Sequence, residues 1–151
     1  MMAKWFVTGF GVGYSPRAPG TAGSLLGMLL FLPIQSMPLH YALLFLALLF
    51  VASVYIINFS LASFVRKDPR EIVIDEIWAM LLILFMIPSS FIAWILGFIL
   101  FRFFDIRKPL GIRKAERLPG GWGVIADDLM AAIYAIVILK ITYPMIIFLT
   151  F

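Results

Sequence analysis

The residues that could carry chemistry gather in two short segments of an otherwise apolar sequence. The chain has 151 residues, of which 8 are Asp or Glu and 12 are Lys or Arg. The carboxylates lie within residues 66–76 and 102–128. Two adjacent pairs occur among them, Asp75-Glu76 and Asp127-Asp128. These two segments therefore predict a site built from acids. The candidate catalytic residues are Asp75, Glu76, Asp105, Asp127 and Asp128.

A cluster of carboxylates in a low-dielectric setting repels itself, so a positive partner is expected among them. Arg102 and Lys108 can offset part of the charge. A hard divalent cation is the natural remainder, because Mg²⁺ takes oxygen ligands and is commonly held by one or two carboxylates plus a substrate phosphate. The spacing of Arg102, Asp105 and Lys108 puts them on one face if a helix continues through them, and Pro109 ends it. The segment therefore predicts a site for a metal ion and a phosphate group.

Each feature also has a simpler structural interpretation. Asp127 and Asp128 could be a pair that complements the dipole at a helix N-terminus. Asp75 and Glu76 are harder to explain in this way, because ionisable groups inside an apolar helix are costly and usually functional. The two bases could be interfacial anchors. Taken together on one face, the acids and bases favour the metal–phosphate site.

A second candidate for phosphate binding is the loop Tyr14–Ser24, which is dense in Pro, Gly and small hydroxyl residues. Its composition predicts turns with exposed amide groups before a helix that begins near Thr21. Such a turn at a helix N-terminus can hold an anion, and this makes Arg17 and Thr21 candidate phosphate ligands. The alternative is that Thr21 only caps the helix.

Composition bounds the class of protein. The hydrophobic content is 64% and the mean hydropathy is +1.07, far above ordinary soluble domains. We therefore expect an all-α polytopic membrane bundle of about four to five spans, forming one domain over residues 1–151. The absence of cysteine excludes disulfides and cysteine nucleophiles. The net charge of +4 is spread over short loops and indicates membrane orientation, not nucleic-acid binding.

The apolar pattern predicts an interfacial segment followed by five helical elements. The first apolar helix is too short for a full span and is expected to be tilted or re-entrant. Asp68 and Glu71 are expected to cap the third helix, which would leave Asp75 and Glu76 nearly two turns inside it. The expected elements are Met1–Gly13, Ala22–Ile34, Leu39–Ala62, Pro69–Ile87, Phe91–Phe104, and a last helix that begins around Asp127 and is interrupted by Lys140 and Pro144.

Five crossings with the N-terminus inside put nearly every charge on one face, which the basic residues mark as cytoplasmic. His40 is expected in a solvated loop on the opposite face, away from the chemistry, and Lys140 is expected to reach the far interface. Asp128, Ala131, Ala132 and Ala135 form a strip of small residues along the last helix, which predicts close helix packing.

The sequence resembles the phosphatidylglycerophosphatase A family in four runs that occur in order. These runs cover residues 11–128, and the combination is specific although each piece alone is weak. They are Gly11–Ser24 (Gly-x-Gly-x-x-Pro-x-x-Pro-Gly-Thr-x-Gly-Ser), Ile74–Glu76 (Ile-Asp-Glu), Phe101–Pro109 (Phe-Arg-x-x-Asp-x-x-Lys-Pro) and Gly120–Asp128 (Gly-Gly-x-Gly-x-x-x-Asp-Asp). The sequence departs from the family pattern at Ala79, Gly111 and Ala132, which puts only local packing in question.

The resemblance implies a Mg²⁺-dependent phosphatase of the bacterial inner membrane that converts phosphatidylglycerol phosphate to phosphatidylglycerol. Without Cys or a usable His, the simplest mechanism is metal-assisted attack by water, and a covalent carboxyl phosphate stays open. On this interpretation Arg102 and Lys108 neutralise the phosphoryl oxygens, and Asp105 is a further ligand or base. The expected Mg²⁺ ligands are Asp75, Glu76, Asp127 and Asp128.

Two other functions would also use acids at the membrane. A divalent-cation or proton-coupled transporter predicts polar residues that continue across the membrane, and the far halves of the expected helices have almost none. A CDP-alcohol phosphotransferase predicts an Asp-Gly-x-x-Ala-Arg motif followed by two spaced aspartates, and the sequence lacks this pattern.

Overall fold

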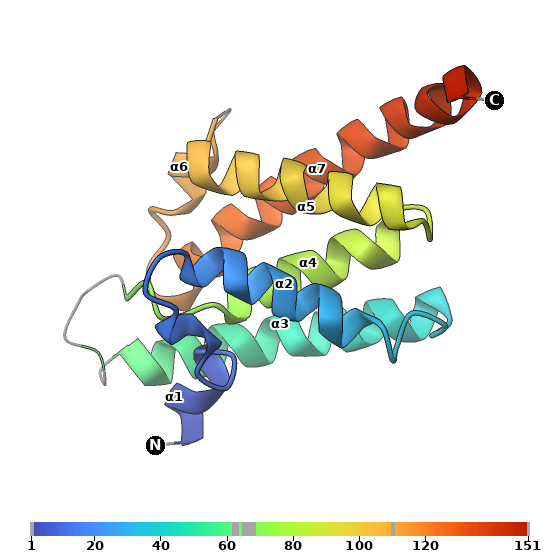
Figure 1. Ribbon diagram of the computed structural model, residues 1–151. Coiled ribbons are helices and arrows are strands. Elements are labelled where there is room, and N and C mark those ends of the chain that lie inside the picture. Colours follow the sequence, from blue (N-terminus) through green and yellow to red (C-terminus); the bar gives the residue numbers. More distant parts are fainter. Residues whose placement is uncertain (1, 62–63, 65–68, 110, 151) are drawn as a thin grey trace.

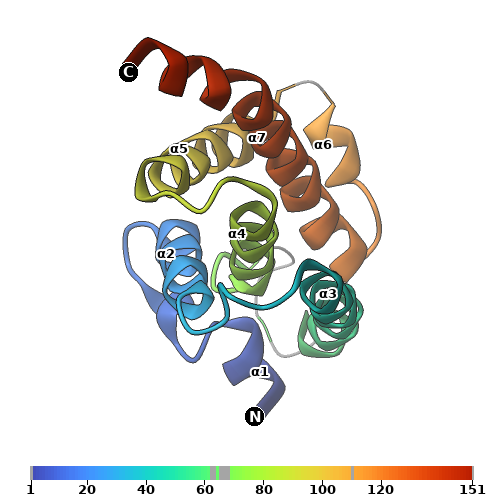
Figure 2. The ribbon, with the colours of Figure 1, turned by 90° about the vertical axis from the view of Figure 1, so that its right-hand side faces the viewer.

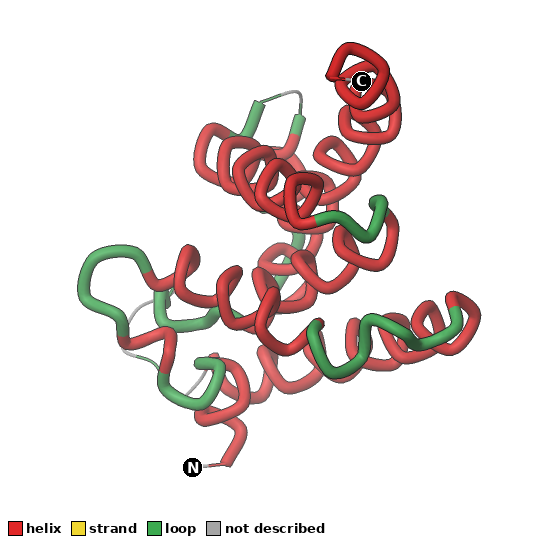
Figure 3. The backbone as a smooth tube through the Cα atoms, turned by 45° about the vertical axis from the view of Figure 1, so that its right-hand side comes forward, coloured by secondary structure: helices red, strands yellow, loops and turns green. Residues whose placement is uncertain are grey.

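All regular secondary structure that the structure describes is helical, as the sequence predicts (Figure 3). The computed structural model describes residues 2–61, 64, 69–109 and 111–150. The elements are α1 (Met2–Val7), the 3₁₀ helix η1 (Val12–Tyr14), α2 (Pro19–Phe31), α3 (Leu39–Leu61), α4 (Ile74–Met86), α5 (Phe91–Arg107), α6 (Ile112–Ala115) and α7 (Gly121–Thr150).

The short helix α4 lies in the centre of the bundle, with α2, α3, α5 and α7 around it (Figure 2). Its sequence is apolar on every side after the first turn, as expected for a helix that is covered all round. Met80 and Ile83 are fully buried, and the Trp78 indole donates a hydrogen bond to the carbonyl of Leu46 in α3 at 2.8 Å. The central position of α4 gives its N-terminal residues contacts with several helices.

Glycines bring α2 unusually close to α4. A methyl group added at Gly23 would lie 2.8 Å from Val73 Cβ, and one at Gly27 would lie 2.9 Å from the carbonyl oxygen of Ile77. Gly20, Gly23 and Gly27 share one face of α2 because they are three and four residues apart. This packing brings the first turn of α2 next to the first turn of α4.

Small residues also allow close helix packing in α7. Ala131, Ala132 and Ala135 are fully buried, and Asp128 is buried at the head of this strip. The predicted close packing of the last helix is therefore confirmed. The departure at Ala132 is accommodated within this buried strip.

The bundle has two distinct ends (Figure 1). The connections at residues 32–38 and 87–90 lie at one end. The starts of α2, α4 and α7 lie at the other end, together with the end of α5. The segments that carry the candidate site residues therefore meet at one end of the molecule.

Among the described residues, one helix is long and apolar enough to cross a membrane: α3, with 23 residues and a mean hydropathy of 2.5. Its bounds agree with the predicted helix Leu39–Ala62 to within one residue. The apolar helix α2 has 13 residues, so the expectation of a short first helix is also confirmed.

The predicted start of α4 is wrong. The helix begins at Ile74 instead of Pro69, and Glu71 lies outside it, so no capping box with Glu71 forms. The Val73 amide donates to the Val7 carbonyl at 2.8 Å, and Gly13 packs directly against the Glu71 carbonyl. These contacts with the N-terminal segment compete with an earlier helix start. The expected cap Asp68 lies outside the described residues.

The predicted start of α7 is also wrong, because the helix begins at Gly121 instead of Asp127. The Gly121 amide donates to Oδ1 of Asn58 in α3 at 2.8 Å, which satisfies one free amide of the first turn. Asp127 and Asp128 therefore lie inside the helix, and the interpretation as an N-terminal dipole pair fails. Asp75 and Glu76, expected deep in a helix, instead occupy the first turn of α4.

Three smaller expectations are corrected as well. The helix α2 begins at Pro19, a residue suited to the first helical position, so Thr21 is not its N-cap. His40 is an exposed residue of α3 and not of a loop. The helix α7 continues through Lys140 and Pro144 to Thr150.

Candidate active site

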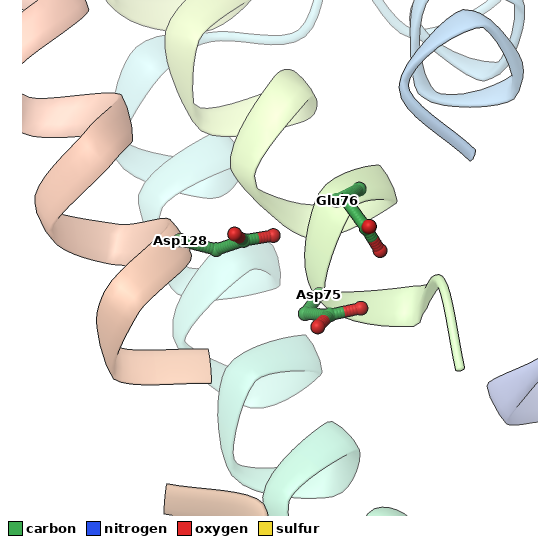
Figure 4. Close-up of side chains that lie close together, drawn as sticks. All are labelled: Asp75, Glu76 and Asp128. Atoms are coloured by element: carbon green, nitrogen blue, oxygen red, sulfur yellow. The ribbon is translucent and has the colours of Figure 1, made fainter. Parts of the chain in front are cut away.

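Five carboxylates from three helices meet at the charged end of the bundle, and we call them the acidic centre. Asp75 and Glu76 come from α4, Asp105 from α5, and Asp127 and Asp128 from α7. Oxygens of Asp75, Glu76 and Asp128 lie within 4.8 Å of one another, and so do oxygens of Asp105, Asp127 and Asp128. Figure 4 shows Asp128 reaching from α7 toward Asp75 and Glu76. The structure thus brings together all five predicted acids.

The acidic centre is buried and only partly satisfied. Asp75, Asp127 and Asp128 are 7%, 6% and 2% exposed. Each has one buried carboxylate oxygen that accepts no hydrogen bond from a described residue, as does Glu76. Buried carboxylate oxygens without partners are rare because their desolvation is costly. The donor set consists only of hard oxygens, so these residues fit a divalent cation such as Mg²⁺.

Arg102 pairs with the acidic centre from α5. Its Nη1 lies 2.7 Å from Oδ2 of Asp105, one helical turn away, and 3.9 Å from Oε1 of Glu76. The side chains of Arg102, Asp105 and Glu76 are each 14% exposed. The predicted shared helical face is confirmed for Arg102 and Asp105 but not for Lys108, because α5 ends at Arg107. Nε of Arg102 is buried without a described partner.

Lys108 follows α5 in the left-handed conformation, with a φ of 46°. This backbone turn directs its ammonium group to Oδ2 of Asp127 at 2.6 Å and to Oε1 of Glu116 at 3.1 Å. Burial lowers the pKa of Lys108, but the hydrogen bonds and charges of Asp127 and Glu116 outweigh it, so its pKa lies above the ordinary value. Gly111 has a φ of 91°, which Pro cannot adopt, and this explains one departure from the family pattern.

The first turn of α2 covers Glu76 and Arg102. A methyl group at Gly20 would collide with Oε1 of Glu76 and would lie 3.0 Å from both terminal nitrogens of Arg102. Thr21 is the next residue and is partly buried. Arg17 is exposed and forms no ion pair with the residues that the structure describes, so it is not brought into the acidic centre.

The formal charge of the acidic centre is unbalanced. Its five carboxylates face two bases, Arg102 and Lys108, and Lys108 is shared with Glu116, so at least three negative charges are in excess. A phosphate group carries further negative charge, and like charges at close range repel strongly where water is scarce. Phosphate could therefore approach only with additional positive charge present.

The sequence did not point to three residues that position the site. Asn58 holds the start of α7, Glu116 is the second partner of Lys108, and Gly20 lets α2 lie over Glu76. A polar Asn near the end of an apolar helix was a usable signal for Asn58. Nothing in the sequence marks the partner of Glu116.

The chain is similar to known bacterial lipid phosphatases. The family model described as "Phosphatidylglycerophosphatase A" matches residues 5–143. A Haemophilus influenzae protein named "Phosphatidylglycerophosphatase A" is 43% identical over 133 residues, covering 86% of this chain and 82% of its own. The Escherichia coli protein of the same name is 33% identical over 127 residues, covering 83% of this chain and 74% of its own.

A third relative carries a different name. The "Putative phosphatidylinositol-3-phosphatase" of Bacteroides thetaiotaomicron is 37% identical over 147 residues, covering 89% of both chains. No solved structure matches the chain. All three names describe phosphatases, so the prediction of a phosphatase is confirmed. From the match over nearly its whole length, the chain belongs to the phosphatidylglycerophosphatase A family.

Proposed function

We propose that this chain is a Mg²⁺-dependent lipid phosphomonoesterase that converts phosphatidylglycerol phosphate to phosphatidylglycerol. The observation that carries the proposal is the buried acidic centre, whose unpaired oxygens lie beside two bases at one end of the bundle. Such a site fits a divalent cation and a phosphate group together. The choice of phosphatidylglycerol phosphate as the substrate follows the names of two relatives.

In this proposal Asp75, Glu76, Asp127 and Asp128 hold Mg²⁺. When bound, Mg²⁺ polarises the phosphoryl oxygens and offsets their charge. Arg102 neutralises a phosphoryl oxygen, and its buried Nε has no described partner to compete for it. Gly20 in the first turn of α2 lies beside Arg102, and in this proposal the amide groups of that turn, including that of Thr21, help to bind the phosphate.

The proposed reaction is attack by water. A water oxygen forms a bond to phosphorus as the bond from phosphorus to the glycerol oxygen breaks. A carboxylate of the acidic centre accepts a proton from the water, and the resulting carboxyl group returns a proton, directly or through solvent, to the leaving glycerol oxygen. Lys108 is an ammonium group in the neutral range, as lysine ordinarily is, and it lies 2.6 Å from Asp127, so in this proposal it acts as a fixed charge and not as the base. The products are phosphatidylglycerol and inorganic phosphate.

We also propose that the helices form a multi-span bundle with the acidic centre at the cytoplasmic face of the inner membrane. Large apolar side chains are exposed along α3, including Leu44, Leu48 and Val51, which suits contact with lipid tails. Exposed basic residues flank the acidic centre at Arg107, Lys114 and their neighbours. Basic residues mark the cytoplasmic side of bacterial membrane proteins, which supports this orientation.

A transporter is the less favoured alternative. The described acids of α4 and α7 all belong to the acidic centre at one end, and past Glu76 the helix α4 is apolar. Lys140 is exposed on α7 and is not part of a buried path.

The test is phosphate release by the purified full-length protein in detergent micelles. We expect release from phosphatidylglycerol phosphate with Mg²⁺, loss of release in EDTA, and recovery when Mg²⁺ is restored. Full activity in chelator would contradict the metal-dependent mechanism. Phosphatidylinositol 3-phosphate serves as the competing substrate, because one relative is named for it. Faster release from that lipid would overturn the proposed head group.

A further inference from the structure

We infer that the acidic centre holds two divalent cations at the same time, with Asp128 as the ligand that they share. The first cation would bind Asp75, Glu76 and Asp128, and the second would bind Asp105, Asp127 and Asp128. The inference rests on the proposed function and deepens it, because it divides the proposed Mg²⁺ ligands between two ions and assigns Asp127, together with Asp105, to the second.

The geometry provides two separate sets of ligands. Within each set, one oxygen from every residue lies within 4.8 Å of the others, and the sets have only Asp128 in common. Three carboxylate oxygens suit a hard divalent cation, whose remaining positions are filled by water and substrate phosphate. The first set spans α4 and α7, and the second spans α5 and α7. Asp128 has two oxygens, so it can contribute one to each cation.

Buried oxygens without partners occur in both sets. Asp75 of the first set has an unpartnered Oδ1, Asp127 of the second set also has an unpartnered Oδ1, and both residues are more than nine-tenths buried. Asp128 is 2% exposed, and its Oδ2 is also without a described partner. Lys108 satisfies only Oδ2 of Asp127. The bases therefore leave each set with an oxygen that a cation would satisfy.

The charge balance favours two cations over one. One divalent cation would leave at least one excess negative charge, and a phosphomonoester dianion would still meet a negative site. Two divalent cations would offset the excess negative charge of the acidic centre. Pairs of metal ions about 3.5–4 Å apart are known to stabilise both the attacking and the leaving oxygen in phosphoryl transfer. The second cation would thus draw the substrate into the site.

Mn²⁺ binding tests the inference without relying on activity. The full-length protein in detergent is dialysed against Mn²⁺, the bound metal is counted, and the EPR spectrum is recorded. We expect two Mn²⁺ per chain and a spectrum of a spin-coupled pair. A single Mn²⁺ per chain at saturation, or two without coupling, would overturn the inference.

Two variants assign the sites. Asp105→Asn should reduce the bound Mn²⁺ from two to one and abolish the coupling, and Glu71→Gln, which changes an acid outside both sets, should retain both ions. Retention of two coupled ions by Asp105→Asn would remove Asp105 from the second set. Phosphate release is measured on the same samples. One bound ion with normal release contradicts only this inference, whereas two coupled ions without release contradict only the proposed function.

Discussion

Nζ of Lys108 lies 2.6 Å from Oδ2 of Asp127, and this contact ties the end of α5 to the interior of α7. The contact depends on the left-handed backbone of Lys108, which turns the side chain away from the course of the helix. It leaves the other oxygen of Asp127 without a described partner. Lys108 thereby orients the Asp127 carboxylate and occupies one of its two oxygens, so that the other stays available to a ligand.

Replacing Lys108 by Gln should therefore lower phosphate release by roughly a hundredfold, because a preorganised charge beside the reacting group is lost. The rate is measured at saturating lipid in Mg²⁺. Lys114→Gln is the matched control, since Lys114 is exposed on α6 and forms no ion pair with a described residue. Equal rates for the two variants would remove Lys108 from the site.

Asp128→Asn tests whether the charge of Asp128 serves catalysis or folding. Asp128 lies beyond the first turn of α7, so the loss of a helix-dipole contact, about 0.3–1 kcal/mol, does not apply. We expect the folded variant to lose roughly a hundredfold or more in turnover, and Asp75→Asn and Glu76→Gln to behave alike. Near-normal release by well-folded Asp128→Asn protein would take this residue out of the site.

Two glycines of α2 should respond differently to Ala. At Gly20 the added methyl group meets Glu76 and Arg102, so turnover should fall by about tenfold or more while the unfolding temperature changes little. At Gly27 the methyl group meets the Ile77 backbone, so the unfolding temperature should fall and the folded protein should stay active. Thermal unfolding and turnover are measured for both variants. The reverse pattern would contradict the placement of α2 over the site.

Asn58→Ala should destabilise the first turn of α7. Loss of the acceptor for the Gly121 amide costs about 0.5–2 kcal/mol, as for other helix N-terminal partners. Asn58→Asp keeps an acceptor oxygen and should retain most of the stability. Unfolding temperatures of the two variants provide the comparison. If Asn58→Ala and the unaltered protein unfold together, the contact contributes nothing.

Single cysteines test the membrane orientation, since the sequence contains none of its own. Lys114→Cys lies in α6, at the end of the bundle where α7 begins, and Ser89→Cys lies in the connection between α4 and α5 at the opposite end. In intact cells an impermeant thiol reagent should label only Ser89→Cys. Labelling of Lys114→Cys alone would reverse the proposed topology. Permeabilised cells, in which both should react, provide the control.

The sequence by itself determined those features that depend on a short stretch of residues, such as an apolar run or a cluster of charges. The apolar run of α3 predicted its bounds to within one residue, because a long uninterrupted apolar stretch allows little else. The scarcity of charges likewise picked out the five acids that meet in the acidic centre, because a carboxylate in an apolar chain needs a reason to be there. The motif spacing was enough to indicate the family.

Only the tertiary structure decided where α4 and α7 begin. The Val73 amide donates a hydrogen bond to the Val7 carbonyl, and the Gly121 amide donates one to the Asn58 side chain. Both acceptors come from distant parts of the chain. Local capping preferences are worth about 1 kcal/mol, the same order as one such contact, so contacts from distant parts of the chain can shift a helix start. The partners within the site depend in the same way on packing, because the turn at Lys108 selects Asp127 and the glycines of α2 decide how closely that helix approaches Glu76.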